Sequence, residues 1–305
     1  MNVLQIVSAP RPFFDVQVDC LEAFGVDCTT VSVPGRRGRG VFEYGRFYTE
    51  LWNTVTRDDF DLVHAHYGMM IPFALAQPKR PVVTTLWGSD VMSDIDWLVE
   101  LTERTAPRCN AVIAPSTALS EQYAGEDVVI PFGVDVEQFR PMDRETARTR
   151  VGWPTDELTV LFPYDASRPV KNFELAKEVV ANVDAPVTLR TLSGVAYDEM
   201  PTYYNASDAV LITSHYEAGP MVIKEAAACN VPVVSTDVGF ASEVLDGVRN
   251  ATVCDDAEEL VSSLEAVLRS DRRSNARETL GDEICPEWSA RRLVDVYREV
   301  LDGDV

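Results

Sequence analysis

The stretch from Ala209 to Ser235 restricts most strongly the folds that are open to this chain. Two apolar, strand-like runs, 209–213 and 231–235, flank a helical segment that begins around Gly219-Pro220. Proline suits the first turn of a helix, and glycine accepts backbone angles that other residues resist. Two strands that a helix connects lie parallel in one sheet. We therefore expect a helix start at the carboxyl end of a strand, where open parallel sheets bind ligands and where the helix dipole favours an anion.

Two acidic residues, Glu217 and Glu225, stand eight positions apart across this helix start. Glu225 lies about 7 Å along the helix axis, and helical side chains lean back toward the N-terminus. Its carboxylate could therefore accept hydrogen bonds from two adjacent hydroxyls beside the bound anion. A phosphate next to such a diol describes the ribose of a nucleotide. For either acid alone a solvated surface role is the simpler interpretation, but the two acids together with Gly219-Pro220 favour a nucleotide site.

Two cations occupy the loop between the strand-like run 158–163 and the helical segment 173–182. They are Arg168 and Lys171. Arg168 suits a diphosphate because its guanidinium is a planar fork of donors, and Lys171 suits it as a point charge. In isolation, an ordinary exposed loop pair would be the better explanation. A third strand-like run, 187–192, ends at Ser193-Gly194, which we expect to pass near the nucleotide base.

Strand-like and helical patterns alternate along the whole chain, which predicts an α/β fold with parallel sheets. The length of 305 residues favours two domains of about 150 residues each. From the segment pattern we expect a first domain over 1–141, a linker over 142–157 and a second domain over 158–287. The last segment, 288–305, is predicted to be a helix that packs back on the first domain.

The charge balance excludes one class of partner. The chain carries 49 acidic and 27 basic residues, for a formal net charge of −22, and only four of its basic residues are lysines. General nucleic-acid binding needs a basic surface, so this balance argues against it. The acidic, lysine-poor composition is typical of proteins from a high-salt cytoplasm, a halophilic interpretation that rests on composition alone.

No apolar run approaches the length of about 20 residues that crosses a bilayer, and the start MNVLQIVSAP reads as a buried strand. We therefore expect a cytoplasmic protein. One basic loop, Pro34–Gly40, interrupts the acidic sequence. It is either a solvated turn or a site that captures an anionic acceptor at a membrane surface, so peripheral membrane contact stays open.

The cysteines and histidines do not indicate a metal site. None of the six cysteines forms a C-x-x-C pair, and we expect reduced, mostly buried thiols. The three histidines are too few and too scattered to favour zinc, and no cofactor is expected. His64 and His66 share one face of a strand, and a buried, hydrogen-bonded structural role is the default for each.

The segment Ser214–Phe240 resembles the Glu-x7-Glu motif of the retaining glycosyltransferases of the GT-B fold, family four. The resemblance extends to the Arg-x-x-Lys-Asn pair, to a Pro-x-Gly-Val-Asp-x-x-x-Phe signature and to an Asp-x-Val-His-x-His run. The matching residues are Thr213, Ser214, Glu217, Pro220, Lys224, Glu225, Ala226, Ala228, Cys229, Pro232, Val233, Val234, Thr236, Asp237, Val238, Gly239, Arg168, Lys171, Asn172, Pro131, Gly133, Val134, Asp135, Phe139, Asp61, Val63, His64 and His66.

Three positions and one loop depart from the family pattern. Trp87 stands where the family commonly has a histidine, Phe132 replaces an asparagine and Ala218 replaces a glycine. The first strand-to-helix loop, 8–13, lacks the Gly-Gly pair that approaches the donor phosphates. Arg11 in this loop is either a substitute cation or a surface arginine.

The resemblance implies two Rossmann-like domains that face each other across a cleft and transfer a sugar from a nucleotide-diphosphate sugar to an acceptor. It further implies retention at the anomeric carbon by front-face attack, without an essential metal. Glu217, Arg168 and Lys171 would then be catalytic, and Glu225 would hold the ribose. The remaining donor-binding positions would be Gly219, Pro220, Met221, Val222, Gly133 and Gly194, and the acceptor-side positions would be His66, Trp87, Asp90 and Arg11.

Other functions stay open on the sequence. Trp87 and the altered first loop are compatible with a catalytically silent nucleotide-sugar-binding module. A nucleotide-sugar epimerase or a sugar-phosphate synthase would use similar domains. A dinucleotide dehydrogenase is disfavoured, because no G-x-G-x-x-G follows the first strand. The motifs do not distinguish among donor bases, donor sugars, or glycan, lipid-linked and small-molecule acceptors.

Overall fold

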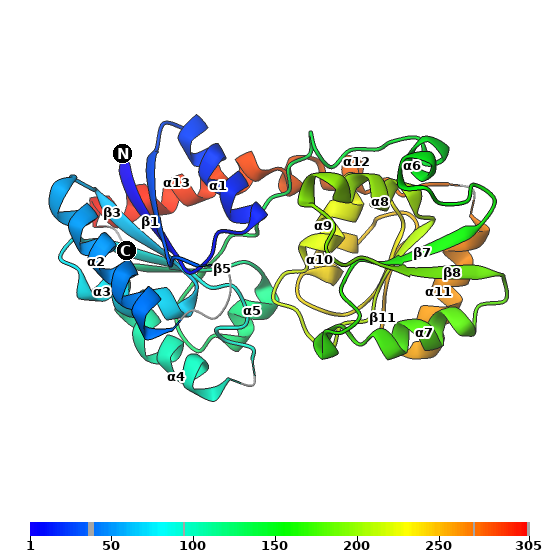
Figure 1. Cartoon of the computed structure of the whole chain (residues 1–305), viewed down its shortest axis with the longest axis horizontal. Coiled ribbons are helices and arrows are strands. Elements are labelled where there is room, and N and C mark those ends of the chain that lie inside the picture. Colours follow the sequence, from blue (N-terminus) through cyan, green and yellow to red (C-terminus); the bar gives the residue numbers. More distant parts are fainter. Residues whose placement is uncertain (36–39, 94, 271, 304–305) are drawn as a thin grey trace. The chain divides into compact units, whose positions relative to one another are not determined.

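The computed structural model describes residues 1–35, 40–93, 95–270 and 272–303, and the chain forms two compact units (Figure 1). Unit 1 comprises Met1–Gly133 and Pro286–Val305, and unit 2 comprises Val134–Cys285. The segment 142–157, which the sequence predicted as a linker, lies within unit 2. It contains helix α6 (Arg144–Val151), which packs on helix α8 (Met200–Ala206) of the same unit. The segment belongs to unit 2, and is not a linker as predicted, because α6 packs on α8 of that unit.

Unit 1 is built on a parallel sheet with the strand order β2-β1-β3-β4-β5-β6. The strands are β1 (Asn2–Val7), β2 (Asp27–Ser32), β3 (Leu62–His66), β4 (Val82–Thr85), β5 (Ala111–Ala114) and β6 (Val128–Val129). The helices are α1 (Pro12–Ala23), α2 (Val41–Arg57), α3 (Ile71–Ala76), α4 (Asp96–Thr105), α5 (Thr117–Gln122) and α13 (Pro286–Asp302), with short 3-10 turns η1 (Gly68–Met70) and η2 (Ala106–Arg108).

The central strands of unit 1 are buried on both faces because helices cover both faces of the sheet. Every residue of β3 and β4 is buried, which is the pattern of parallel strands in α/β proteins. Helices α1 and α13 lie together on one face, and α2, α3 and α4 lie on the other (Figure 1). The buried core joins residues of the first strands to α13, through Leu293, Tyr297 and Val300 among others.

A buried hydrogen-bond chain fixes α13 to the sheet of unit 1. His64 Nδ1 lies 2.6 Å from the Tyr297 hydroxyl, and His64 Nε2 lies 2.7 Å from the Thr85 hydroxyl. Burial holds the pKa of His64 well below its usual value, so the ring is neutral and both nitrogens serve as partners. The expectation of a buried, hydrogen-bonded structural histidine is confirmed for His64.

Unit 2 is built on a second parallel sheet, with the strand order β11-β10-β9-β7-β8. The strands are β7 (Leu158–Phe162), β8 (Val187–Thr191), β9 (Ala209–Ile212), β10 (Val233–Thr236) and β11 (Ala251–Cys254). Besides α6 and α8, the helices are α7 (Phe173–Ala181), α9 (Met221–Ala228), α10 (Ala241–Leu245), α11 (Ala257–Arg269) and α12 (Ala276–Leu280), with the 3-10 turns η3 (Pro169–Lys171), η4 (Tyr197–Glu199) and η5 (Gly281–Ile284).

The order of the strands in unit 2 brings particular loops together. Strands β7 and β9 are hydrogen-bonded neighbours, and β9 also pairs with β10. Since all three are parallel, the loops that follow them emerge at one edge of the sheet, the carboxyl edge. Helices α7 and α11 pack on one face, and α8, α9 and α10 cover the other (Figure 1).

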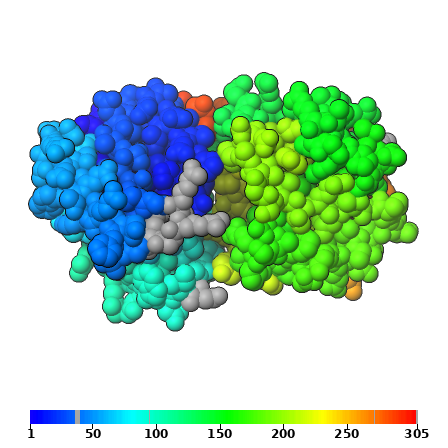
Figure 2. Space-filling view, viewed as in Figure 1, coloured from blue at the N-terminus to red at the C-terminus, as the bar shows by residue number. Residues whose placement is uncertain are grey.

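Two expectations concern contact with a membrane. None of the helices in the described part of the chain combines the length and the apolarity that crossing a bilayer requires. The arginines of the basic loop, at 36–39, lie outside the described residues. Helix α2, in the blue part of the surface (Figure 2), begins at Val41. Its first residues, Val41 and Phe42, are 89% and 87% exposed.

All six cysteines are reduced thiols, as the sequence predicted. The expectation that most of them are buried is wrong. Cys229 and Cys254 are buried, whereas the other four are partly exposed, since they lie on helix surfaces, at a sheet edge and in loops. These four are Cys20, Cys28, Cys109 and Cys285.

Candidate functional site

An ion pair joins the loops that follow β7 and β9 at the carboxyl edge of unit 2. The Lys171 ammonium, at the end of η3, contacts Oε1 of Glu217. Both side chains are largely withdrawn from water, at 5% and 13% exposure. The two residues are 46 positions apart in sequence, and the pairing of β7 with β9 brings them together.

Two hydroxyls complete the surroundings of the Glu217 carboxylate. Tyr164 and Ser214 each donate a hydrogen bond of 2.9 Å to Oε1. The Lys171 Nζ atom also lies 4.2 Å from the centre of the Tyr164 ring, where a cation is attracted to the ring face. Within the described part of the chain these contacts all converge on Oε1, which leaves Oε2 of Glu217 as an acceptor for a ligand.

The charges of this cluster influence one another. Burial lowers the pKa of the Lys171 amine, the Glu217 carboxylate opposes that shift, and the Arg168 charge adds to it. Burial, reinforced by the charge of Glu217, raises the pKa of Tyr164 well above its usual value. Tyr164 is therefore a neutral hydrogen-bond donor at any physiological pH.

Backbone contacts hold the loop after β7 against the loop after β9. The Thr213 hydroxyl donates to the carbonyls of Lys171, at 3.2 Å, and Asn172, at 2.9 Å. The His215 amide donates to the Val170 carbonyl at 2.9 Å. Asn172 turns the chain into α7 with a φ of 52°, a left-handed conformation that asparagine tolerates. Lys171 is thus positioned by its backbone as well as by its charge.

The start of α9 differs in detail from the sequence prediction. The helix begins at Met221 with Pro220 as its N-cap, and Gly219 lies outside the helix without a positive φ. The requirement for glycine is steric instead, because a Cβ atom at Gly219 would lie 2.7 Å from Cε1 of Phe240. As at any helix start, the first amides of α9, from Met221 and Val222, have no carbonyl partner within the helix itself and can bind an anion.

A second glycine allows the same close approach from the opposite loop. Gly239, after β10, has a φ of +57°, and a Cβ atom there would lie 2.7 Å from Cδ of Pro220. The Gly219-Pro220 and Gly239-Phe240 segments therefore interlock. This contact fixes where the N-terminus of α9 points.

Glu225 lies inside α9 and is 4% exposed. Its Oε2 accepts a hydrogen bond of 2.7 Å from the Tyr204 hydroxyl of α8. Burial raises the pKa of Glu225 to about 7, while hydrogen bonds from Tyr204 and Tyr197 oppose the shift. A buried carboxylate that titrates near neutral pH, at the carboxyl edge of a parallel sheet, is typical of functional sites.

Two further predicted donor residues lie at the carboxyl edge of unit 2, and one lies in unit 1. Arg168 is exposed in the loop that carries Lys171. Gly194 follows β8 with a φ of +72°, and the neighbouring Ser193 hydroxyl donates to Asp165 at 3.2 Å. Gly133 is buried and is the last residue of the first segment of unit 1.

The predicted acceptor-side residues gather at the carboxyl edge of unit 1. His66 ends β3, Trp87 follows β4, and their ring centres are 6.2 Å apart. Phe13, from the start of α1, packs edge-on against Trp87 at 5.1 Å. His66 is buried and its Nε2 lies 2.8 Å from Oε1 of Gln5. Burial lowers the pKa of His66 to about 3, so the ring is neutral.

Asp90 and Arg11 have different surroundings at this edge. The Asp90 carboxylate is fully buried and accepts hydrogen bonds from the amides of Gly68, Trp87 and Gly88 at 2.7 to 3.1 Å. It therefore shapes the loop that presents Trp87. Arg11 is exposed at the N-cap of α1.

Three tyrosines and one phenylalanine of these sites were missed from the sequence. Tyr164 lies two residues after β7, at the start of the loop that carries Arg168 and Lys171, and this position could have signalled it. Tyr197, Tyr204 and Phe240 reach the site only through the packing of η4, α8 and the loop after β10, so no local pattern identifies them.

Two family models match the chain, one in each unit. The model described as "Glycosyltransferase Family 4" matches residues 8–138, and the model described as "Glycosyl transferases group 1" matches residues 170–283. The second match contains the Lys171–Glu217 pair and Glu225.

Curated relatives are similar over much of the chain. The putative teichuronic acid biosynthesis glycosyltransferase TuaC of Bacillus subtilis is 29% identical over 60% of this chain and 55% of its own length. A D-inositol 3-phosphate glycosyltransferase of Frankia alni is 29% identical over 79% of this chain and 75% of its own length. The matched stretch thus spans about half of the first relative and three quarters of the second.

Solved structures share the fold over nearly the whole chain. Sucrose-phosphate synthase from Thermosynechococcus elongatus aligns with a TM-score of 0.80 at 16% identity, over 99% of both chains. HepE from Anabaena, solved in complex with UDP-glucose, aligns with a TM-score of 0.72 at 16% identity, again over 99% of both chains. The predicted architecture of two Rossmann-like domains of the GT-B type is confirmed.

Proposed function

Because the chain belongs to the family 4-like glycosyltransferases of the GT-B fold, we propose that it transfers a sugar from a nucleotide-diphosphate sugar to an acceptor hydroxyl, with retention at the anomeric carbon. Glycosyl transfer itself is part of the proposal, and the family models that match each unit support it. The donor class, the retaining course and the roles of individual residues are the rest of the proposal.

The observation that carries the proposal is the Glu217 cluster. A carboxylate bound through one oxygen by Lys171, Tyr164 and Ser214 keeps its position while its second oxygen accepts from a ligand hydroxyl. Sugar hydroxyls are the ligands that such an acceptor suits. We assign Glu217 to hydroxyls of the donor sugar, next to the anomeric carbon.

The leaving diphosphate is assigned to the cationic side of the same edge. Negative charge builds on the leaving oxygens as the glycosidic bond breaks, and fixed positive groups stabilise that charge. Arg168 is exposed and free to fold over a diphosphate, Lys171 is buried beside it, and the first amides of α9 add partial positive charge.

We assign Glu225 to the ribose of the nucleotide. Its helix places it behind the amides that would hold the phosphate, and its ionised form accepts hydroxyl hydrogen bonds. Since the pKa of Glu225 is raised to about 7 by burial, donor binding should strengthen as the pH rises through that value.

In the proposed reaction the acceptor hydroxyl attacks the anomeric carbon from the face that the diphosphate leaves. The bond from the acceptor oxygen to the anomeric carbon forms as the bond to the diphosphate oxygen breaks, and the acceptor proton passes to the leaving phosphate. No protein nucleophile is needed, and no metal ion takes part.

For the acceptor we propose the carboxyl edge of unit 1, where His66 and Trp87 lie and where Arg11 supplies an exposed cation. An aromatic ring packs well against a sugar or cyclitol ring, and a guanidinium suits a phosphate on it. Several relatives are named D-inositol 3-phosphate glycosyltransferases, so this compound belongs among the acceptors to be tried first.

The proposal is tested by incubating the protein with a panel of nucleotide sugars and measuring diphosphate release. Each donor is tried alone, with D-inositol 3-phosphate, and with a lipid extract, in the presence and absence of EDTA. We expect release that depends on an acceptor, is unaffected by EDTA and is lost in Glu217→Gln. The anomeric configuration of the product, read by NMR, tests retention.

Three results would contradict the proposal. Donor binding without turnover for any acceptor would indicate a silent binding module. Conversion of the donor itself would indicate an epimerase. A product of inverted configuration would remove the front-face mechanism while leaving the transferase activity in place.

A further inference from the structure

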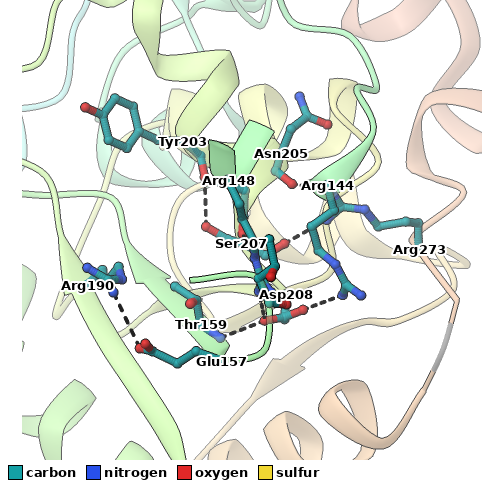
Figure 3. A network of polar contacts seen from close by, with 12 residues as sticks. Arg144, Arg148, Glu157, Thr159, Arg190, Tyr203, Asn205, Ser207, Asp208 and Arg273 are labelled. Atoms are coloured by element: carbon teal, nitrogen blue, oxygen red, sulfur yellow. Dashed lines mark hydrogen bonds and ion pairs between the residues drawn. The ribbon is translucent and has the colours of Figure 1, made fainter. Parts of the chain in front are cut away.

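A second charged cluster lies at the amino edge of the sheet of unit 2, the edge opposite the candidate donor site. Asp208 directly precedes β9, and its carboxylate contacts the guanidinium groups of Arg144 and Arg148 (Figure 3). The amide of Thr159, at the start of β7, also donates to Asp208 Oδ2 at 2.6 Å. These bonds satisfy both carboxylate oxygens.

More positive charge is gathered here than Asp208 balances. The Arg273 guanidinium is anchored to backbone carbonyls, with bonds of 2.9 Å to Ser207 and 2.7 Å to Asn205. Arg272, next to it, is exposed. Burial lowers the pKa of Arg273 to about 10, and the positive charge of Arg144 adds to that shift. A guanidinium whose charged form is destabilised in this way is stabilised by a further anion beside it.

These side chains surround a hollow of about 480 Å³. Among the described residues that line it are three arginines, Arg144, Arg272 and Arg273, and two carboxylates, Asp143 and Asp208. Asp143 is committed to the N-cap of α6, where its Oδ2 accepts from the Thr146 amide at 2.9 Å. Arginines therefore outnumber carboxylates among the described residues that line the hollow, although the chain carries a net charge of −22.

We propose that this hollow binds a phosphate group. Guanidinium groups recognise phosphate through paired, charge-assisted hydrogen bonds, and each carries five N–H donors. The bonds from Arg144 to Asp208 and from Arg273 to the two carbonyls leave further donors on both groups. The volume lies within the range of about 300 to 1,000 Å³ that small-molecule sites occupy. The ligand is therefore either free phosphate or a small phosphate monoester.

The test is calorimetric titration of the full chain with inorganic phosphate at an ionic strength held constant with KCl. Arg144→Gln/Arg272→Gln should weaken binding roughly tenfold or more, as the loss of charge-assisted hydrogen bonds predicts. Arg150→Gln is the matched control, because Arg150 is an exposed arginine of the same helix, α6, that does not line the hollow. It should bind phosphate as the unchanged protein does.

A second control separates this site from the donor edge. Arg168→Gln changes an exposed arginine at the carboxyl edge and should leave phosphate binding at the hollow in place. Titrations with glucose 6-phosphate and with AMP then show whether an ester or the free ion binds more tightly. The proposal is overturned if the double variant binds phosphate as well as the unchanged protein, if Arg150→Gln weakens binding equally, or if KCl alone produces the same heat. Circular dichroism confirms that each variant is folded.

Discussion

Glu225 is the proposed ribose ligand, and the burial of its carboxylate lowers the stability of the folded chain near neutral pH. In the unfolded chain its carboxyl ionises near the ordinary value for glutamate, whereas in the folded chain burial raises its pKa to about 7. The folded state therefore holds a proton that the unfolded state releases. By linkage, stability falls as the pH rises through this window, and the full cost is present above pH 7.

The first prediction follows from that sign. Glu225→Gln removes the ionisation and keeps an acceptor for the Tyr204 hydroxyl, so the variant should melt at a higher temperature than the unchanged protein at pH 8. The difference should vanish toward pH 4.5, where both side chains are neutral. Melting curves from pH 4.5 to 8 measure it. A difference that is independent of pH would show that Glu225 does not titrate in this range.

The same variant tests the ribose assignment. Donor affinity of the unchanged protein should rise about tenfold between pH 6 and pH 8 if only the ionised carboxylate accepts the diol. In Glu225→Gln the affinity should be weaker and flat over this range. A pH-dependent affinity that persists in the variant would assign the titration to another group.

The Lys171–Glu217 pair supports a second prediction. Lys171→Met leaves the 13% exposed Glu217 carboxylate without its cation, and breaking a buried pair in this way costs about 3 to 5 kcal/mol. Adding Glu217→Gln should restore much of the free energy of unfolding, because no charge is then left unpaired. It should not restore sugar transfer.

Urea denaturation and donor turnover, measured on both single variants and the double variant, separate stability from function. Recovery of stability with no recovery of turnover supports a catalytic role for the pair. If the double variant also regains turnover, the pair is structural and the assignment of Glu217 to the donor sugar fails.

At the scale of elements, the interlocked loops after β9 and β10 set the direction of α9. Gly219→Ala would place a Cβ atom 2.7 Å from Phe240, which is 1% exposed and has little room to move. We predict a loss of about 1 to 3 kcal/mol of stability, as for overpacked cores, together with weaker donor binding. The combined variant Gly219→Ala/Phe240→Leu should recover part of both.

The matched control is Gly45→Ala, in α2 of unit 1. A Cβ atom at Gly45 meets nothing within 4 Å, so this substitution should keep or slightly raise stability and leave donor binding unchanged. Equal effects at Gly219 and Gly45 would mean that the clash with Phe240 is absorbed. Melting temperatures and the donor KM measure the outcome.

The sequence predicted the α9 region because local patterns encode it. The strand-like runs around it and Pro220 gave the order of elements, and helix α9 begins two residues after Gly219. The steric reason for Gly219 could not be read, since Phe240 approaches it only through the packing of two loops. Tyr204 was missed for the same reason, because α8 must fold against α9 before it meets Glu225.

The whole molecule carries a net charge of −22. Mutual repulsion of surface carboxylates favours expanded states, and salt screens it, because the Debye length falls from about 10 Å at 0.1 M to about 3 Å at 1 M. Unit 2 contains two basic clusters, one with Arg168 and Lys171 and one with Arg144 and Arg273. They relieve this repulsion only locally.

We therefore predict that the melting temperature rises steadily from low salt to molar KCl at pH 7. The slope should be smaller at pH 4.5, where protonation of carboxylates reduces the net charge and leaves less repulsion to screen. Melting in KCl at both pH values checks this, with sucrose as an uncharged co-solute. If the melting temperature rises equally with KCl at the two pH values, the rise is due to general exclusion of solutes from the protein surface. If the melting temperature does not change with KCl at pH 7, the interpretation of the composition as an adaptation to high salt is wrong.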